Sequence, residues 1–116
     1  MRILRIQDSS GRGPWIPGFS HAWLDVDRPA LPAPIFETVK NFSSIVEKAH
    51  ANGLHIGCAA KEDCLSMWVS TTEMEVLKKY GFSVVNATQC RIIAEDENQV
   101  LIVSKKPFKK LPKVNL

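Results

Sequence analysis

The chain has 116 residues, of which 45% are hydrophobic and 23% are charged. This length and hydrophobic content suit one compact domain with a single core and argue against two folded domains. The three cysteines, Cys58, Cys64 and Cys90, are odd in number and show no paired spacing, which argues against the disulfide framework of a small secreted protein. No apolar run approaches membrane-spanning length. We therefore expect a cytoplasmic protein that does not associate with membranes.

The formal net charge of +3 is unevenly distributed along the chain. Five of the 15 basic residues lie in the last twelve positions, which leaves 10 basic residues against 12 acidic ones in the body. We predict a single α+β domain over residues 1–104 and a basic tail rich in proline and lysine over residues 105–116. A mildly acidic body argues against a nucleic-acid interface on the domain, so only weak association through the tail is expected.

The first half of the chain predicts a strand, a long loop and a helix. Residues 2–6 alternate charged and apolar side chains, as in a short strand that ends at Gln7. Residues 8–34 carry five of the seven prolines and no regular period, so we expect a loop, ordered by its own apolar side chains. From Ile35 to Ala49 the apolar positions recur at helical spacing, which predicts one helix.

The second half predicts a strand at 54–58, a short helix at 61–68 and a further helix that begins near Ser70. Ser70 with Glu73, and Thr72 with Glu75, offer two overlapping capping boxes for that helix, and Gly81 ends it. We expect Met74, Leu77 and Tyr80 on its inner face.

Two β-branched runs, 82–93 and 99–103, predict two antiparallel strands with a turn at 95–98. The expected order is β-α-β-α-α-β-β. It describes an α+β fold with a small mixed or antiparallel sheet and about three helices.

Two short motifs contain residue types that can bind a metal ion or a phosphate. His55, Cys58 and Cys64 lack a fourth ligand and match no common zinc spacing, so we expect no metal. The Gly11-Arg12-Gly13 sequence could hold a phosphate through backbone N–H groups and a guanidinium, but no helix follows it, and a plain turn explains it as well.

A wider pattern joins Arg5 on the first strand, a small-residue segment at 57–63 and the acidic turn 94–98 before a late strand. This pattern resembles the ADP-ribosyltransferase-like fold, whose active members bind and cleave NAD with a first-strand Arg or His, a mid-sheet Ser or Tyr and a Glu before a late strand. The resemblance implies that a cleft for NAD or ADP-ribose is lined by four residues, Arg5, Glu95, Glu97 and Gln99.

The chain departs from that family pattern at two places. Residues 58–60 read Cys-Ala-Ala where hydroxyls are expected, and Gln99 stands where a glutamate is expected. An amide cannot supply the negative charge that stabilises an oxocarbenium-like centre. The resemblance therefore implies ligand binding without turnover.

Residues 5–20, 57–68 and 77–84 together resemble small uncharacterised proteins of phages and prophages. This resemblance implies a stoichiometric binding protein that covers a surface of a host protein, as a counter-defence inhibitor would, with no cofactor and no catalytic residues. The exposed aromatic and basic side chains are the expected anchors. They are Arg12, Trp15, Phe19, His21, Trp23, Lys105, Lys106, Lys109 and Lys110.

The sequence therefore favours host-protein binding first, a NAD- or ADP-ribose-handling enzyme or degenerate ligand binder second, and nucleic-acid association through the lysines third.

The tail adds one structural expectation. Phe108, Leu111 and Val114 recur at every third residue, which would align them on one face of a polyproline II segment. We expect that face to dock on this domain or on a partner, and a disordered end is the alternative.

Overall fold

The computed structural model describes residues 1–15, 19, 22–25, 27–28 and 30–115, and these residues form an α+β fold. Five strands make one sheet in the order β3-β1-β2-β5-β4, and every neighbouring pair is antiparallel. The α+β class with an antiparallel sheet is therefore confirmed. The strands are β1 (Ile3–Gln7), β2 (His55–Lys61), β3 (Ser83–Asn86), β4 (Arg91–Glu95) and β5 (Val100–Ser104).

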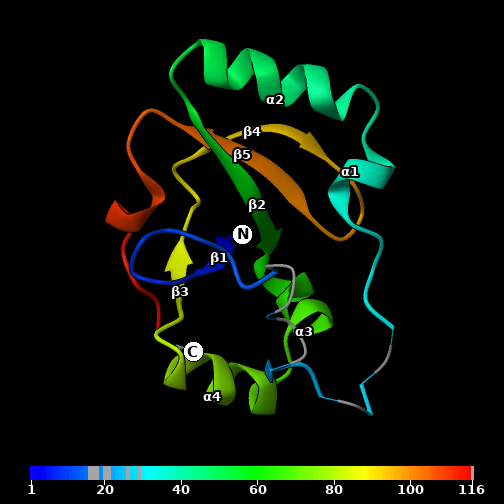
Figure 1. The fold of residues 1–116 in the computed structure, drawn as a ribbon, viewed down its shortest axis with the longest axis vertical. Helices are drawn as coiled ribbons and strands as arrows, with labels where there is room; N and C mark the ends of the chain where they lie inside the picture. Colours follow the sequence, from blue (N-terminus) through cyan, green and yellow to red (C-terminus); the bar gives the residue numbers. More distant parts are fainter. Residues whose placement is uncertain (16–18, 20–21, 26, 29, 116) are drawn as a thin grey trace.

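Helices lie around this sheet (Figure 1). Helix α2 (Phe42–Ala51) crosses the half of the sheet that holds β2, β5 and β4, whereas α4 (Thr71–Lys79) lies beyond β3 at the opposite end. No helix in the described part of the chain is both long enough and apolar enough to cross a membrane.

Strand β1 is buried on both faces because its alternate residues enter two different apolar clusters. Ile3 packs in a cluster with Phe108, and Leu4 and Ile6 pack in a second cluster with Leu77. Arg5 is the only residue of β1 that is not buried. A cation at the centre of an otherwise buried strand marks the place where the site is found.

The predicted helix over 35–49 is wrong in one respect, because the chain breaks it into α1 (Ile35–Thr38) and α2. Val39 is extended and Asn41 adopts a left-handed conformation with a φ of 59°. Thr38 Oγ1 donates a hydrogen bond of 2.7 Å to Asp96, so a tertiary contact holds the end of α1. The apolar stripe continues across the break, which is why periodicity did not reveal it.

The segment after β2 follows the prediction more closely. It forms a 3₁₀ turn (Glu62–Cys64) and α3 (Leu65–Trp68), and then α4 begins at the Ser70–Glu73 capping box. Helix α4 ends before Gly81, whose φ is +89°. Tyr80 was expected on the inner face but is 53% exposed.

The run 82–93 was predicted as one strand and instead supplies β3 and β4, which lie at opposite edges of the sheet. Asn86 Oδ1 accepts a hydrogen bond of 3.0 Å from the N–H of Thr88, and this turn ends β3. The expected antiparallel hairpin is confirmed for β4 and β5, which pair across the 95–99 turn.

The C-terminal segment packs onto the domain. Phe108 and Leu111 are buried in the cluster that contains Ile3, although the chain there forms a 3₁₀ turn (Phe108–Lys110) where polyproline II was predicted. The N–H of Asn86 donates to the carbonyl of Pro112 at 2.8 Å, and the N–H of Val114 donates to Val84 at 2.8 Å. These bonds cover the outer edge of β3.

Candidate functional site

The site begins where β1 and β2 separate. The two strands pair only at Ile3 with Lys61 and at Leu4 with Ala60, while β1 and β3 remain paired as far as Gln7. Beyond Leu4 the side chain of Arg5 spans the opening, and its Nη1 donates to the carbonyl of Cys58 at 2.8 Å. A guanidinium thus takes the place of the backbone donor that a continuous ladder would supply.

Arg5 is fixed in this position by further contacts. Its Nη2 donates to the carbonyl of Gly11 at 2.9 Å and its Nε to Oε1 of Gln7 at 3.1 Å. Its Cζ lies 4.7 Å from the centre of the Phe108 ring, a cation–π geometry. A Cβ at Gly57 would lie only 2.8 Å from both Arg5 Nη1 and Phe108 Cε2, so a larger residue there would displace these side chains.

The charge of Arg5 has no paired carboxylate. None of the salt bridges among the described residues includes Arg5, and its three hydrogen-bond acceptors are neutral oxygens. Burial lowers the pKa of Arg5, against smaller opposing effects of Cys58, Cys90 and Asp8, yet an arginine remains protonated in any ordinary protein site. A net positive charge therefore lies at this point of the cleft.

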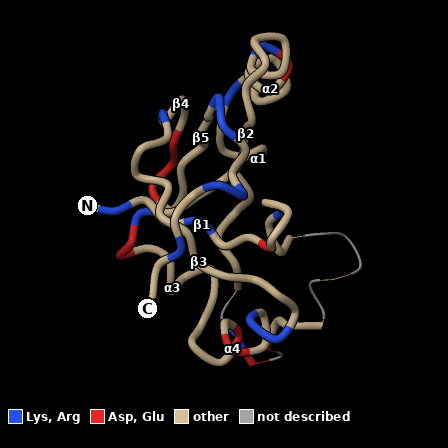
Figure 2. The backbone as a smooth tube through the Cα atoms, turned by 90° about the vertical axis from the view of Figure 1, so that its left-hand side faces the viewer, with Lys and Arg blue, Asp and Glu red and all other residues tan. Residues whose placement is uncertain are grey.

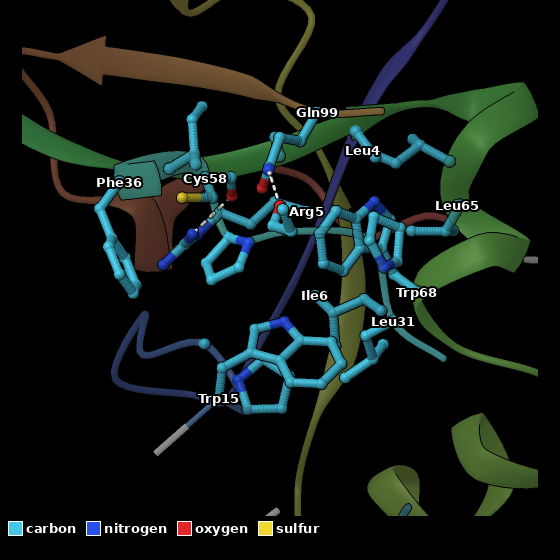
Figure 3. Close-up of a pocket in the computed structure, with 18 of the residues that line it drawn as sticks. Leu4, Arg5, Ile6, Trp15, Leu31, Phe36, Cys58, Leu65, Trp68 and Gln99 are labelled. Atoms are coloured by element: carbon cyan, nitrogen blue, oxygen red, sulfur yellow. Dashed lines mark hydrogen bonds between the residues drawn. The ribbon is translucent and has the colours of Figure 1, made fainter. Parts of the chain in front are cut away.

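A cleft of about 610 Å³, which we call the aromatic cleft, opens beside Arg5. Figure 3 shows Trp15 and Trp68 on its walls, Phe36 and Leu31 at its edges, and Cys58 and Gln99 close to Arg5. Trp15 meets Trp68 edge to face, with 5.9 Å between ring centres. These residues come from β1, the 8–34 loop, α1, β2, α3 and the turn before β5, so segments from both halves of the chain converge on one cleft.

Gln99 is held at the start of β5 by two donated hydrogen bonds. Its Nε2 donates to the carbonyl of Ala33 at 2.8 Å and to Oδ2 of Asp96 at 2.9 Å, while its Oε1 has no partner among the described residues. Burial alone would raise the pKa of Asp96, but hydrogen bonds from Thr38, Gln99 and Asn98 outweigh it and lower that pKa. The ionised Asp96 thus orients Gln99.

The structure brings together two of the four predicted cleft residues. Arg5 and Gln99 line the aromatic cleft, whereas Glu95 and Glu97 do not. The carboxylate of Glu95 is exposed and lies 3.9 Å from Lys61 Nζ, and Glu97 offers only its backbone carbonyl to the thiol of Cys64 at 3.8 Å. Glu95 pairs with Val100 in the hairpin and therefore faces the opposite side of the sheet from Gln99, and Glu97 is exposed in the turn.

The aromatic residues of the loop divide into core and surface. Trp23 was expected as an exposed anchor but is only 3% exposed, and its Nε1 donates to the carbonyl of Pro14 at 3.3 Å. Phe19 is half-buried and stacks on Phe82 at 5.7 Å. Trp15 is 41% exposed at the rim of the cleft. His21, which was predicted with them, lies outside the described residues.

The basic candidates are all exposed. Arg12 and the four predicted lysines lie at the surface, the lysines on either side of Phe108. Figure 2 faces the side of the molecule that carries the C-terminal segment, and basic positions recur through the middle of that view.

Cys58 is the only thiol that lines the aromatic cleft among the described residues. It reaches solvent through the cleft, and partial desolvation raises the pKa of its thiol more than the nearby Arg5 lowers it. The neutral thiol is a poor nucleophile. Within the described ranges no cluster of three His, Cys, Asp or Glu side chains could hold a metal ion.

Sequence reasoning did not identify Phe36, Trp68 or Gly57 as site residues. Phe36 and Trp68 stand on short helices whose apolar residues suggested core positions, and no sequence signal showed that both line one cleft. Gly57, directly before Cys58 in an otherwise continuous strand, was a usable signal, because glycine within a strand marks a close approach. Comparisons with protein-family models, curated proteins and solved structures found no match for this chain.

Proposed function

We propose that this protein binds a nucleotide of the NAD or ADP-ribose class in the aromatic cleft and leaves it intact. One observation carries this proposal: Arg5, a cation without a paired carboxylate, lies at the base of a cleft whose walls are aromatic. Ligand clefts of 300–1,000 Å³ with apolar walls and a few fixed polar groups are typical of small-molecule sites, and about 610 Å³ lies within that range.

The walls suit a flat heteroaromatic ring. Trp15 and Trp68 offer indole surfaces, and stacking of a base on an aromatic side chain contributes about 1–3 kcal/mol. The free Oε1 of Gln99 can accept one hydrogen bond from a ligand N–H or O–H group. Shape and hydrogen bonding thus support recognition of a base or a nicotinamide ring.

The same lining argues against cleavage of the ligand. Among the described residues no Asp or Glu lines the aromatic cleft, and Gln99 cannot carry a negative charge. A glycosidic bond that breaks through an oxocarbenium-like state needs a nearby carboxylate. This favours a binding protein related in arrangement to ADP-ribosyltransferases over an active transferase.

Titration calorimetry with ADP-ribose and NAD tests the proposal. We expect saturable binding by the wild-type protein and at least about tenfold weaker binding by Trp15→Ala, because one stacking surface is removed. The matched control is Tyr80→Ala, which removes an exposed aromatic ring at the C-terminal end of α4 that contacts Phe19 and does not line the cleft. Chromatography of the incubated NAD should show no nicotinamide. No heat at millimolar ligand, or equal effects of the two variants, would rule the proposal out.

A second candidate function is capture of a host protein, as the resemblance to phage proteins implies. It is favoured by the apolar side chains at the rim of the cleft, where Trp15, Leu31 and Phe36 are 41%, 36% and 61% exposed. Aromatic residues of this kind dominate protein interfaces. A specific partner captured from host extract by the wild type, but not by Phe36→Ser, would support it. Identical proteins captured by both baits would contradict it.

A further inference from the structure

A second hollow lies on the other side of Arg5, and its lining differs from that of the aromatic cleft. It has a volume of about 720 Å³ and lies where the loop after β1, the end of α2, the start of β2 and Phe108 converge. We call it the basic hollow, because its charged and titratable groups are Arg5, Arg12, His50 and His55, with the thiol of Cys58. No carboxylate lines it within the described residues.

Arg12 is available to a ligand. Its guanidinium forms no hydrogen bond or ion pair with any described residue, and the residue is exposed. Its backbone is held in place, however, because Oδ1 of Asp8 accepts hydrogen bonds from the N–H groups of Arg12 at 3.0 Å and Ser10 at 2.9 Å. The loop therefore presents a fixed backbone and a guanidinium that forms no hydrogen bond with the described residues.

The nearest carboxylate of this loop is already engaged. Burial would raise the pKa of Asp8, but its hydrogen bonds with Ser10 and Arg12, together with the charge of Arg12, outweigh it and lower that pKa. Asp8 therefore stays ionised and serves the loop backbone, and it is not among the groups that line the hollow. The backbone carbonyls at the end of α2 are also engaged, since they accept hydrogen bonds from the N–H groups of Asn52 and Gly53.

The two hollows adjoin at lining residues that they share. Arg5, Gly13, Trp15 and Cys58 line both of them. One ligand could thus place a ring in the aromatic cleft and an anionic group in the basic hollow, with the guanidinium of Arg5 between the two parts. Guanidinium groups bind phosphate oxygens in a bidentate manner, and such charge-assisted bonds are about twice as strong as neutral ones.

We propose that the basic hollow is an anion site that takes the phosphate groups of the ligand, through Arg12 and His55 together with Arg5. This inference rests on the proposed function, because it assigns the phosphate end of the same nucleotide. It restricts the ligand class to phosphorylated compounds, so ADP-ribose and NAD bind by both ends whereas adenosine binds only by its ring.

Inorganic pyrophosphate is the probe that isolates this hollow. We expect it to bind the wild-type protein in titration calorimetry, to bind more weakly as salt is added, and to lose at least about tenfold in affinity in Arg12→Gln and in His55→Gln. Lys79→Gln, an exposed charge change on α4, is the matched control and should leave the affinity unchanged. Arg12 has no side-chain partner among the described residues, so Arg12→Gln is expected to fold normally, which its thermal melt checks.

Absence of pyrophosphate binding, or equal losses in Arg12→Gln and Lys79→Gln, would overturn the inference. The two proposals fail separately. If adenosine and ADP-ribose bind equally and Arg12→Gln changes neither affinity, the basic hollow is not an anion site although the nucleotide cleft remains. If pyrophosphate binds through Arg12, but adenosine does not bind and the affinity for ADP-ribose is no higher than that for pyrophosphate, the anion site stands and the nucleotide proposal falls.

Discussion

Arg5 and Glu73 are both charged groups withdrawn from bulk water, and they are compensated in opposite ways. The side chain of Glu73 is 1% exposed and its Oε1 lies 2.9 Å from Arg28 Nη1, while Ser70 and Asp25 donate backbone N–H groups to its two oxygens. Arg5 donates only to neutral acceptors. The charge of Glu73 is therefore neutralised by a cation within the fold, whereas the positive charge of Arg5 is not neutralised by a paired carboxylate.

This difference indicates that Glu73 stabilises the fold, whereas Arg5 remains able to bind a ligand. A buried carboxylate that meets a cation and two N–H groups has no capacity left for a ligand, and it joins the 8–34 loop to the start of α4. A guanidinium held by neutral oxygens beside two hollows keeps its attraction for an anion. Four predictions test this contrast, beginning with the largest expected effect.

Glu73→Gln should be the most destabilising of the substitutions. It removes the buried carboxylate that pairs with Arg28, and removal of one member of such a pair costs about 3–5 kcal/mol. Urea unfolding should show this loss, and Glu75→Gln, an exposed neighbour on α4, should change the free energy of unfolding by less than about 0.5 kcal/mol. If Glu73→Gln also falls below about 0.5 kcal/mol, the contrast between the two charges fails.

Arg5→Met should cost less stability and more binding. The carbonyls of Cys58 and Gly11 lose their donor, which costs about 1–3 kcal/mol in total because water in the open cleft can replace part of it. ADP-ribose binding should disappear in calorimetry. Arg5→Lys keeps the charge without the planar fork and should retain weakened binding. Full affinity in Arg5→Met would show that the cation has no role.

Acidification tests the contribution of the ionised Glu73 to stability. Burial alone would raise the pKa of Glu73, but its hydrogen bonds with Ser70 and Asp25 and the charge of Arg28 outweigh it and place the pKa below the ordinary 4.5. The ionised form therefore stabilises the fold above about pH 4.5, and this contribution is lost as the pH falls through the lowered pKa. Thermal melts from pH 6 to pH 3 should show the decline, with a shallower slope in Glu73→Gln. Equal slopes would contradict this assignment.

Gln99→Glu should have the smallest effect on the fold and none on chemistry. The introduced glutamate would face Asp96 and the carbonyl of Ala33, so it takes up a proton to avoid the charge of Asp96, and the loss of the two donated bonds costs about 1–2 kcal/mol. Gln99→Met, which removes the same donors without adding charge, is its control. Release of nicotinamide from NAD by Gln99→Glu would contradict the view that the cleft lacks the other groups needed for cleavage.

The elements were predictable where a local rule decides them. The Ser70–Glu73 capping box and the β4–β5 hairpin depend on residues close in sequence, and both formed as expected. The break at Asn41 and the division of 82–93 into two edge strands depend on tertiary contacts of Thr38 and on the turn at Asn86, which periodicity does not record.

The site was predictable only in part for the same reason. Arg5 and Gln99 were predicted from the resemblance to the ADP-ribosyltransferase-like fold, which points to a first-strand Arg and to the residue before a late strand. The partners of Glu95 and the burial of Trp23 depend on the path of the 8–34 loop and on the direction of each side chain. The basic hollow joins residues from four segments, and no short motif contains them.

The most direct test of the central claim is an ADP-ribose titration followed in a two-dimensional ¹H–¹⁵N spectrum of the labelled protein. The account predicts saturable shifts of the Arg5 Nε–H signal and of the backbone amides of Gly13, Cys58 and Gln99, with Glu73 and the rest of α4 unchanged. A spectrum that stays constant at millimolar ADP-ribose, or shifts confined to α4, would contradict it.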